Sequence, residues 1–399
     1  MSELLTVEQA QALVLGRAHV LPDEGVRLST AAGRITARDV AAAVDLPPFD
    51  SSAMDGYAVR AADLPGELRV VDHAAAGLPA ASAVVAGNAV EISTGGVVPA
   101  GADAVLPVEY VVKHDNTIRT ESVLQPGANV RPRGGDVAVG DTVVPRGVRL
   151  GAAQLGALAA VGAGEVVCTR RPRVAILATG TELVAPGVPL EPGQIYESNG
   201  VMLAAALAAA GADIELLPAV ADDEAAHRAA LERGLDADVL VTSGGVSVGP
   251  HDLVRRIEAE LGVDEVFWRV AMRPGKPVSF GVHGQTLVFG LPGNLVSSLV
   301  GAELFVKPAL RALQGLLEPR PRFDAGRLGT SVRRSDARDD FVRARVRLDE
   351  DGTILEPLSG QESHMIARAA AADALVHVPR GEGEIEAGAQ IRWLRLGEP

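Results

Sequence analysis

A buried strand that runs straight into a glycine-rich turn sets the strongest constraint on how this chain can fold. The apolar residues Val239-Leu240-Val241 lead into Thr242-Ser243-Gly244-Gly245-Val246-Ser247-Val248-Gly249, and a helix containing Asp252 is expected after them. Such a turn gathers backbone N–H groups at the start of the helix, where they suit a phosphate or another oxyanion. Glycine also lets a ligand approach the backbone without a Cβ in the way. The pattern predicts a strand–turn–helix unit that binds an anion.

The same alternation of strands and helices extends over residues 171–313. The apolar run 174–178 is followed by helical patterns near 199–211 and 223–234, and a last helix ends near Leu313. Strands that are bounded on both sides by helices pack into a sheet that is covered on both faces. The sequence therefore predicts a central doubly wound α/β domain with a mostly parallel sheet.

Smaller domains are expected on both sides of this one. Thr6-Val7-Glu8-Gln9 has the capping-box pattern of a helix over 6–19, which can pack with the Ala/Leu/Gly-rich segment 141–164. Short β-like runs between Gly, Pro and Asn, Val84-Val85 among them, predict an inserted small β domain. Alternation of apolar residues with arginine over 342–348 predicts a half-exposed strand in a C-terminal, β-barrel-like domain. The predicted domains are a discontinuous N-terminal helical/mixed domain (1–44 and 137–168), the inserted β domain (45–136), the α/β domain (169–317) and the C-terminal β domain (318–399).

Composition excludes several classes of function. Aromatic residues make up 3% of the 399 residues and the formal net charge is −14, so we expect no nucleic-acid partner. The single cysteine, Cys168, cannot form an intrachain disulfide. The sequence has neither the histidine spacing of a zinc site nor a P-loop motif. It shows no signal peptide and no membrane-spanning run, so we expect a cytoplasmic protein without a membrane partner.

Four polar or glycine-rich loops are expected to meet at one edge of the α/β sheet, because ligands of such sheets bind beyond the carboxyl ends of the strands. These loops are Thr179-Gly180-Thr181-Glu182, Ala221-Asp222-Asp223, Ser243-Gly244-Gly245-Val246-Ser247 and Gly290-Leu291-Pro292-Gly293-Asn294. Their backbone donors, hydroxyls and carboxylates suit a phosphate with Mg²⁺, which prefers oxygen ligands. Taken singly, Glu182 and Asp252 are equally well explained as charges that complement a helix dipole, and Asp222-Asp223 as an N-cap.

A second candidate site is the cationic turn Arg273-Pro274-Gly275-Lys276-Pro277. Its prolines restrict the backbone, so Lys276 loses little entropy when it binds an oxyanion as a point charge. A solvated surface turn is the alternative interpretation. In the N-terminal half, Asp55 and Asp136 lie in turns of the kind that also connect hairpin strands.

Together these segments resemble the molybdopterin molybdenumtransferases, the bacterial relatives of the gephyrin E domain, over nearly the whole length of the chain. The matching segments are Ser52–Ala58, Thr94-Gly95, Arg133-Gly134-Gly135-Asp136, Thr179–Leu183, Ser243–Gly249 with Asp252, Pro274–Pro277, Gly290–Asn294 and Ser363-His364-Met365. The chain departs from the family where it has Arg273 in place of the usual Lys and Leu295 in place of the usual Pro.

The resemblance implies the last step of molybdenum cofactor synthesis, in which adenylyl-molybdopterin and molybdate react with Mg²⁺ to give the cofactor and AMP. The implied catalytic residues are Asp55, Glu182, Asp222, Asp252 and Lys276, with Glu182 and Asp252 as the Mg²⁺ ligands. The implied substrate-binding residues are Thr94, Asp136, Thr179, Gly180, Ser243, Gly244, Gly245, Ser247, Arg273, Pro292, Gly293, Asn294, Arg343 and Ser363. The resemblance assigns molybdate to three of these residues, Arg273, Arg343 and Ser363, together with Lys276.

The resemblance further implies a homodimer whose cleft is completed by the partner's inserted β domain, so that Asp55, Thr94 and Asp136 act across the interface. Other proteins of molybdopterin synthesis are possible partners. Two other functions remain open: the related adenylyltransferase step, which activates molybdopterin with ATP, and a scaffold that binds molybdopterin or protein partners without chemistry.

Overall fold

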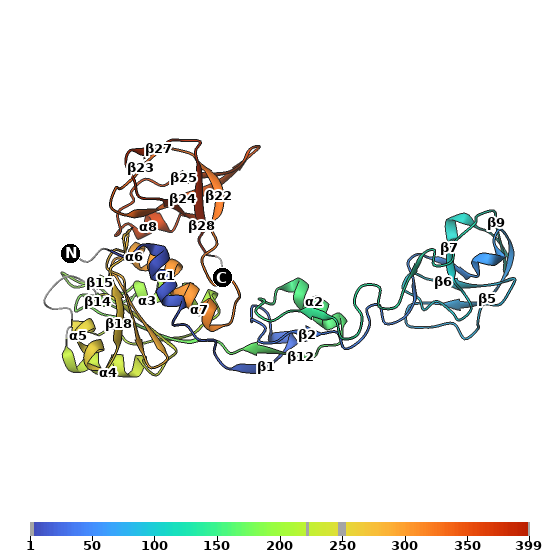
Figure 1. Cartoon of the computed structure of the whole chain (residues 1–399), viewed down its shortest axis with the longest axis horizontal. Coiled ribbons are helices and arrows are strands. Elements are labelled where there is room, and N and C mark those ends of the chain that lie inside the picture. The colour runs from blue at the N-terminus through green and yellow to red at the C-terminus, as the bar shows by residue number, and fades with distance from the viewer. Residues whose placement is uncertain (1–3, 221–222, 246–252, 398–399) are drawn as a thin grey trace. The chain divides into compact units, whose positions relative to one another are not determined.

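The computed structural model of this chain describes residues 4–220, 223–245 and 253–397, and these form two compact units (Figure 1). The first unit contains the residues up to Glu24, residues 33–37 and the chain from Cys168 onward. The second contains residues 25–32 and 38–167. Each unit is described by itself.

A six-stranded sheet forms the centre of the first unit, with the strand order β16-β13-β17-β21-β20-β18. The strands are β13 (Arg173–Ala178), β16 (Asp213–Leu216), β17 (Val239–Ser243), β18 (Asp264–Trp268), β20 (Ser279–His283) and β21 (Thr286–Leu291). The first four strands in the spatial order are parallel, and β20 and β18 are antiparallel to their neighbours. The mostly parallel sheet expected from the sequence is confirmed.

Helices cover both faces of this sheet, as Figure 1 shows. They are α3 (Asn199–Ala209), α4 (Glu224–Gly234), α5 (Leu253–Glu260), α6 (Leu295–Gly301) and α7 (Lys307–Leu313), with a π-helical turn over Ala302–Val306. Successive residues of β13 point to opposite faces: Val174 and Ile176 pack with α3, α6 and α7, whereas Ala175 and Leu177 pack with α4 and α5. This arrangement confirms the doubly wound α/β domain.

The first helix, α1 (Val7–Leu15), begins with the predicted capping box. The Thr6 hydroxyl accepts a hydrogen bond from the Gln9 backbone N–H, and the Gln9 side chain accepts one from the Thr6 N–H. Its apolar face packs into the core of the α/β unit, where Gln11 also donates to the Leu304 carbonyl at 2.9 Å. The expected packing of this helix with segment 141–164 is therefore wrong, because that segment and its helix α2 (Ala152–Ala160) belong to the second unit. Helical periodicity identifies an apolar face but not its partner.

The second unit contains the expected small β domain, a six-stranded sheet with the order β7-β4-β6-β5-β9-β8. Its strands are β4 (Gly56–Val59), β5 (Gly66–Ala74), β6 (Asn88–Ile92), β7 (Ala104–Pro107), β8 (Val112–His114) and β9 (Thr117–Thr120). The strand expected at Val84-Val85 is wrong, since these residues lie in the loop before β6. Shorter strands are β1 (Asp23–Arg27), β2 (Val40–Ala41), β3 (Ser51–Ser52), β10 (Val130–Arg131), β11 (Thr142–Val144) and β12 (Glu165–Thr169).

A closed five-stranded barrel follows the α/β domain within the first unit, which confirms the barrel-like C-terminal domain. Its strands are β22 (Asp324–Leu328), β24 (Asp339–Asp349), β25 (Gly352–Pro357), β26 (Ala374–Val378) and β28 (Gln390–Arg395), and pairing of β24 with β26 closes it. The short strand β19 (Met272–Arg273) runs parallel to the start of β24 and so attaches the barrel to the α/β domain. None of the helices in the described ranges combines the length and the apolar character needed to cross a bilayer.

Candidate functional site

Three of the four predicted loops meet at the carboxyl ends of the parallel strands. Ser243, the last residue of β17, is in register with Ala178 on one side and Leu291 on the other. The Thr179 N–H donates to the Ser243 carbonyl at 3.0 Å, and the Gly244 N–H donates to the Leu291 carbonyl at 3.1 Å. The loops after β13, β17 and β21 therefore share one rim.

The fourth loop, after β16, approaches the same rim through Val220. The Val220 N–H donates to the Ala178 carbonyl at 3.2 Å, and the Gly180 N–H donates to the Val220 carbonyl at 3.1 Å. Asp223, the next described residue, caps α4 by accepting from the Ala226 N–H at 2.7 Å, which is the structural role considered for it. Three predicted site residues, Asp222, Ser247 and Asp252, lie outside the described residues.

Close packing explains the two glycines at the end of β17. Gly244 has φ +97°, and a Cβ there would lie 2.7 Å from the Thr179 carbonyl oxygen and 2.8 Å from the Thr179 hydroxyl oxygen. Gly245 has φ +67°, and its Cβ would lie 2.5 Å from a methyl carbon of Val254. Only glycine accepts this backbone conformation at these contacts. The rim is thus built from backbone that is packed tightly against Thr179.

The hydroxyl of Ser243 faces the protein interior. Ser243 is buried, and its oxygen lies 3.5 Å from both the Pro292 carbonyl oxygen and the Ser298 hydroxyl oxygen. Ser298 in turn donates to the Pro292 carbonyl. The hydroxyl therefore ties the end of β17 to the loop after β21, and it is the backbone of Ser243 that lies along the rim.

Asn199, the first residue of α3, belongs to the rim and was not predicted. Its side-chain N–H donates to the Gly293 carbonyl at 2.7 Å, while its side-chain oxygen is buried without a hydrogen-bond partner. Buried polar atoms are nearly always paired, so the Asn199 side-chain oxygen is an exception at the rim. Its sequence signal was the polar run Glu197-Ser198-Asn199 immediately before an Ala/Leu-rich helix.

Glu182 is the described carboxylate at the rim that is suited to a metal ion. It is exposed, and a Cβ on Gly180 would lie 2.7 and 2.8 Å from its two carboxylate oxygens, so the side chain lies over the loop after β13. Within the described ranges, no three His, Cys, Asp or Glu side chains gather as a metal-binding group. Mg²⁺ is commonly held by one or two carboxylates together with substrate phosphates and waters. Glu182 is therefore suited to a metal ion that is also coordinated by the phosphate of a bound ligand. The described side chains do not form a complete metal site by themselves.

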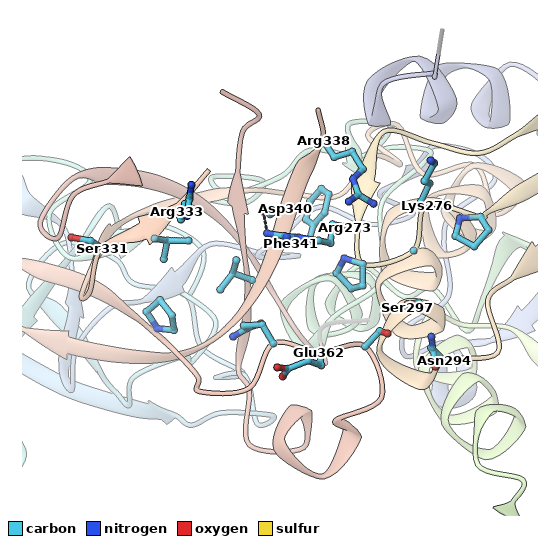
Figure 2. A pocket seen from close by; sticks show the side chains of 18 residues that line it. Arg273, Lys276, Asn294, Ser297, Ser331, Arg333, Arg338, Asp340, Phe341 and Glu362 are labelled. Atoms are coloured by element: carbon cyan, nitrogen blue, oxygen red, sulfur yellow. Dashed lines mark hydrogen bonds and ion pairs between the residues drawn. The ribbon is translucent and has the colours of Figure 1, made fainter. Parts of the chain in front are cut away.

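A second recognition region is a cavity of about 790 Å³ between the α/β domain and the barrel, shown in Figure 2. Four cationic side chains and two acidic ones line it: Arg273, Lys276, Arg333, Arg338, Asp340 and Glu362. Asn294, Ser297 and Ser363 add polar groups. An excess of positive charge in a chain of net charge −14 marks this cavity as a place for an anion.

The predicted cationic turn forms one wall of this cavity. Gly275 has φ +98°, and a Cβ there would lie 2.5 Å from the terminal methyl of Met272 and 3.4 Å from the Ser297 carbonyl oxygen. This close approach seats the turn against the start of α6. Lys276 is half-buried, and its ammonium pairs with no other described side chain. A half-buried ammonium group without a partner among the described side chains is well suited to bind an oxyanion. This favours an anion-binding turn over the alternative interpretation, a solvated surface turn.

Arg343 lies behind the cavity and does not line it. The residue is 1% exposed, and its guanidinium donates to the carbonyl oxygens of Gly360 at 2.8 Å, Glu362 at 3.2 Å and Met365 at 2.9 Å. Burial lowers the pKa of Arg343. The half-exposed strand predicted for 342–348 is therefore wrong at this position. Arg343 holds the segment that carries Ser363 in place.

Asp340, at the start of β24, is the second residue that the sequence did not reveal. It is buried and forms an ion pair with Arg273. Burial raises the pKa of Asp340, and the Arg273 guanidinium opposes this only in part. Its other carboxylate oxygen is buried without a hydrogen-bond partner.

In the second unit, Asp55 and Thr94 form a small polar pair. One Asp55 carboxylate oxygen accepts from the Thr94 N–H at 2.7 Å and from the Thr94 hydroxyl at 2.9 Å, and these bonds lower the pKa of Asp55. Asp136 lies in a separate turn of this unit, where its N–H donates to the Leu46 carbonyl at 2.9 Å. The structure thus brings Asp55 and Thr94 together as ionised acid and donor.

Leu295, where the chain departs from the family, is not among the residues that line the cavity. Leu295 is the first residue of α6, next to the N-cap Asn294, and the cavity is lined by Asn294 and Ser297 on either side of it. Proline is favoured at this helical position because the N–H there has no partner within the helix. Leucine satisfies the same backbone requirement.

Three family models match consecutive parts of the chain. Residues 5–162 match a model described as the MoeA N-terminal region (domain I and II), and residues 175–312 match a probable molybdopterin binding domain. Residues 325–396 match the MoeA C-terminal region (domain IV). The second of these ranges contains the rim and the cationic turn.

Similar proteins match along almost the whole chain. A protein of Mycobacterium tuberculosis named molybdopterin molybdenumtransferase 2 is 37% identical over 97% of this chain and 98% of its own length. A protein of Haemophilus influenzae named molybdopterin molybdenumtransferase is 36% identical over 97% and 98%. A solved structure of the molybdopterin biosynthesis MoeA protein from Pyrococcus horikoshii is 27% identical, with a TM-score of 0.85 over 98% of this chain and 100% of that one.

Proposed function

Since this chain belongs to the MoeA family and is a molybdopterin molybdenumtransferase, we propose that it inserts molybdate into adenylyl-molybdopterin with the aid of Mg²⁺, giving the molybdenum cofactor and AMP. The observation that carries the proposal is the continuity between the glycine-rich rim and the cationic cavity. Asn294 lines the cavity and directly follows Gly293, whose carbonyl is bound by Asn199 at the rim. A substrate with a phosphate end and a metal-binding end suits two such adjoining regions.

The rim is suited to the pterin phosphate and the adenylyl group. Backbone from the loops after β13, β17 and β21 meets there, and backbone N–H groups stabilise phosphate oxygens without competing charge. Glu182 and Asp252 would hold Mg²⁺, which when bound supplies positive charge beside the phosphoanhydride as it breaks. Asn199 fixes the loop after β21 at the rim through its bond to the Gly293 carbonyl.

The cavity is suited to molybdate, a small tetrahedral dianion. Arg273 offers a planar set of N–H donors, and Lys276 offers a compact charge at the opposite side of a rigid turn. Together they would lower the free energy of the dianion against the field of a negatively charged chain. Ser363 presents its polar group from the segment that Arg343 holds.

We also propose an assembly in which two copies of the chain form each cleft. The protein acts as a homodimer in the cytoplasm, and the partner's β domain completes each cleft with Asp55, Thr94 and Asp136. The support for this is the Asp55–Thr94 pair, because it places an ionised, hydrogen-bonded carboxylate on the β domain in the second unit.

The experiment that tests the function is AMP release from adenylyl-molybdopterin with Mg²⁺, with and without molybdate. We expect molybdate-dependent release by the wild-type chain. For Lys276→Met we expect kcat/KM for molybdate to fall on the order of 100-fold, because one charged donor to the reacting anion is lost. Lys113→Met is the matched control, since Lys113 pairs with Glu91 in the β domain at 2.8 Å.

The same assay separates the alternatives. ATP consumption with molybdopterin, in the absence of molybdate, would identify the adenylyltransferase step instead. Tight binding of adenylyl-molybdopterin with no AMP release under any condition would identify a scaffold. Molybdate-independent AMP release that survives Lys276→Met would contradict the assignment of molybdate to the cavity.

A further inference from the structure

The pairing of Arg273 with Asp340 is built into the backbone. β19 and β24 run parallel, with Met272 opposite Asp339 and Arg273 opposite Asp340. The Asp339 N–H also donates to the Ala271 carbonyl at 3.0 Å. Two segments about seventy residues apart in the chain are thereby held in one register, and their facing side chains form the ion pair seen in Figure 2.

The two members of the pair differ sharply in exposure. The Asp340 side chain is 3% exposed, whereas the Arg273 side chain is 56% exposed. The acid therefore lies beneath the guanidinium, at the base of the cavity wall. A terminal nitrogen of Arg273 reaches one Asp340 oxygen, and arginine carries five N–H donors in a fixed plane. The donors that Asp340 does not use remain available to a ligand in the cavity.

The Asp340 carboxylate is buried, and only part of its hydrogen-bonding capacity is satisfied. Burial raises the pKa of Asp340, and its second oxygen has no hydrogen-bond partner. Removing one partner of an ion pair is strongly destabilising when the remaining charge is buried. The Arg273 side chain is 56% exposed, so water can satisfy its charge when Asp340 is replaced by a neutral residue. Packing alone therefore does not explain why the chain has an aspartate at position 340. A role in holding the Arg273 guanidinium does explain it.

We propose that Asp340 is a positioning residue for molybdate, which holds the Arg273 guanidinium as an oriented donor fork on the wall of the cavity. This inference rests on the proposed function of the cavity and deepens it. An arginine fork binds two oxygens of one oxyanion at once, but only when its plane is fixed. Arg273 carries such a fork, whereas the point charge of a lysine would need no orientation. Asp340 supplies the orientation that arginine requires.

The test measures molybdate binding to the full-length protein by titration calorimetry, with molybdate alone as the probe. Asp340→Asn keeps the shape of the side chain and removes its charge. We expect its Kd for molybdate to be about tenfold weaker, the order of magnitude seen when groups that orient a binding residue are removed. We expect its thermal midpoint to be equal to that of the wild type or higher. The matched control is Asp349→Asn, since Asp349 lies at the far end of β24 and pairs with Arg327 at 2.8 Å.

A double-mutant cycle shows whether Asp340 acts through Arg273. In an Arg273→Ala background, Asp340→Asn should change the Kd for molybdate less than twofold, because nothing remains to be oriented. In the AMP-release assay, Asp340→Asn should raise KM for molybdate while kcat changes much less. A lower thermal midpoint with an unchanged Kd would reduce Asp340 to a structural residue and overturn the inference. Equal effects of Asp340→Asn in both backgrounds would overturn it as well.

Failure of this inference is distinguishable from failure of the proposed function. If the wild-type protein binds molybdate and Asp340→Asn binds it equally well, the inference is wrong and the function stands. If the wild-type protein binds no molybdate while Arg273→Ala and Lys276→Met leave AMP release unchanged, the proposed use of the cavity is wrong, and the inference is overturned with it.

Discussion

Gly244 and Thr179 show that the backbone conformation of the rim depends on contacts between single atoms. The backbone of Gly244 bonds to Leu291 on one side and packs against Thr179 on the other. Asn199 and Asp340 show the opposite situation, since each has a buried polar oxygen without a partner. Gly244 and Thr179 pack the rim tightly. Asn199 and Asp340 each keep one polar oxygen whose hydrogen-bonding capacity is not used within the protein. Gly244, Thr179 and Asn199 belong to the rim, and Asp340 lines the cavity.

We expect Gly244→Ala to lower the free energy of unfolding by about 3 kcal/mol, because a Cβ 2.7 Å from the Thr179 carbonyl oxygen adds a clash to the left-handed strain at φ +97°. Gly284→Ala is the control, since Gly284 has φ +59° in the β20–β21 turn with no atom near its Cβ. It should lose about 1 kcal/mol from strain alone. Chemical denaturation of both variants gives the comparison, and equal losses would mean that the rim relaxes around the added methyl.

Among the elements, three parallel strands of the α/β sheet are linked at their amino ends by one residue, Asp238. Asp238, just before β17, accepts from both terminal nitrogens of Arg170 and from the Arg173 N–H, each at 2.7 Å. The Asp238 carbonyl also accepts from the Leu287 N–H at 3.0 Å. Through its carboxylate and its backbone carbonyl together, Asp238 therefore aligns the starts of β13, β17 and β21, whose opposite ends form the rim.

The pH dependence of stability should reveal this fastening. Burial pushes the pKa of Asp238 upward, but the bonds from Arg170 and Arg173 outweigh it and leave the pKa below the ordinary value of 3.8. A carboxyl whose pKa is depressed by folding stabilises the native state above its unfolded pKa, and this stabilisation is lost as the pH falls through the folded pKa. Asp238→Asn should therefore be less stable by about 2 kcal/mol at pH 7.

Denaturant unfolding at a series of pH values checks this. The difference between wild type and Asp238→Asn should shrink as the pH falls below 3.8 toward the folded pKa. A difference that persists unchanged in acid would show that the amide disturbs packing and that charge is not involved.

The sequence predicted best those elements whose pattern is repeated. Buried strands followed by glycine-rich loops were enough to predict the rim, because parallel strands necessarily bring their carboxyl ends together. The alternation over 342–348 could not show that Arg343 is buried, since an arginine in a strand looks the same whether water or backbone carbonyls satisfy it. Asp340 was not predicted as a site residue for a related reason. Its partner Arg273 is far away in sequence, and only the pairing of β19 with β24 brings the two residues together.

At the scale of the whole molecule, local charge opposes net charge. The chain carries a formal charge of −14, yet the cavity is lined by four cations and two acids. The Asp55–Thr94 pair lies in one compact unit, and Glu182 and the cavity lie in the other. This division gives the proposed shared cleft a direct test, because the two units can be inactivated separately.

Mixed dimers should recover activity that neither parent has. We expect Asp55→Asn and Glu182→Gln each to be nearly inactive in AMP release. When both are co-expressed with different tags, a cleft shared between subunits leaves one intact site in each mixed dimer. The mixture should then show about a quarter of the wild-type activity, since about half of the dimers are mixed. Purified mixed dimers as inactive as their parents would show that each site is completed within one chain.

Asn294 stands at the junction of the rim and the cavity, and this position limits how the protein can change. A substitution of Asn294 alters the surroundings of both ends of the substrate at once. The binding of one end therefore cannot be changed through this residue without affecting the other. Arg333 and Arg338 are different, because they line the cavity from the barrel and are not part of the rim loops. A search for variants that prefer tungstate to molybdate should begin with these two arginines, where a change of oxyanion preference leaves the recognition of the pterin end intact.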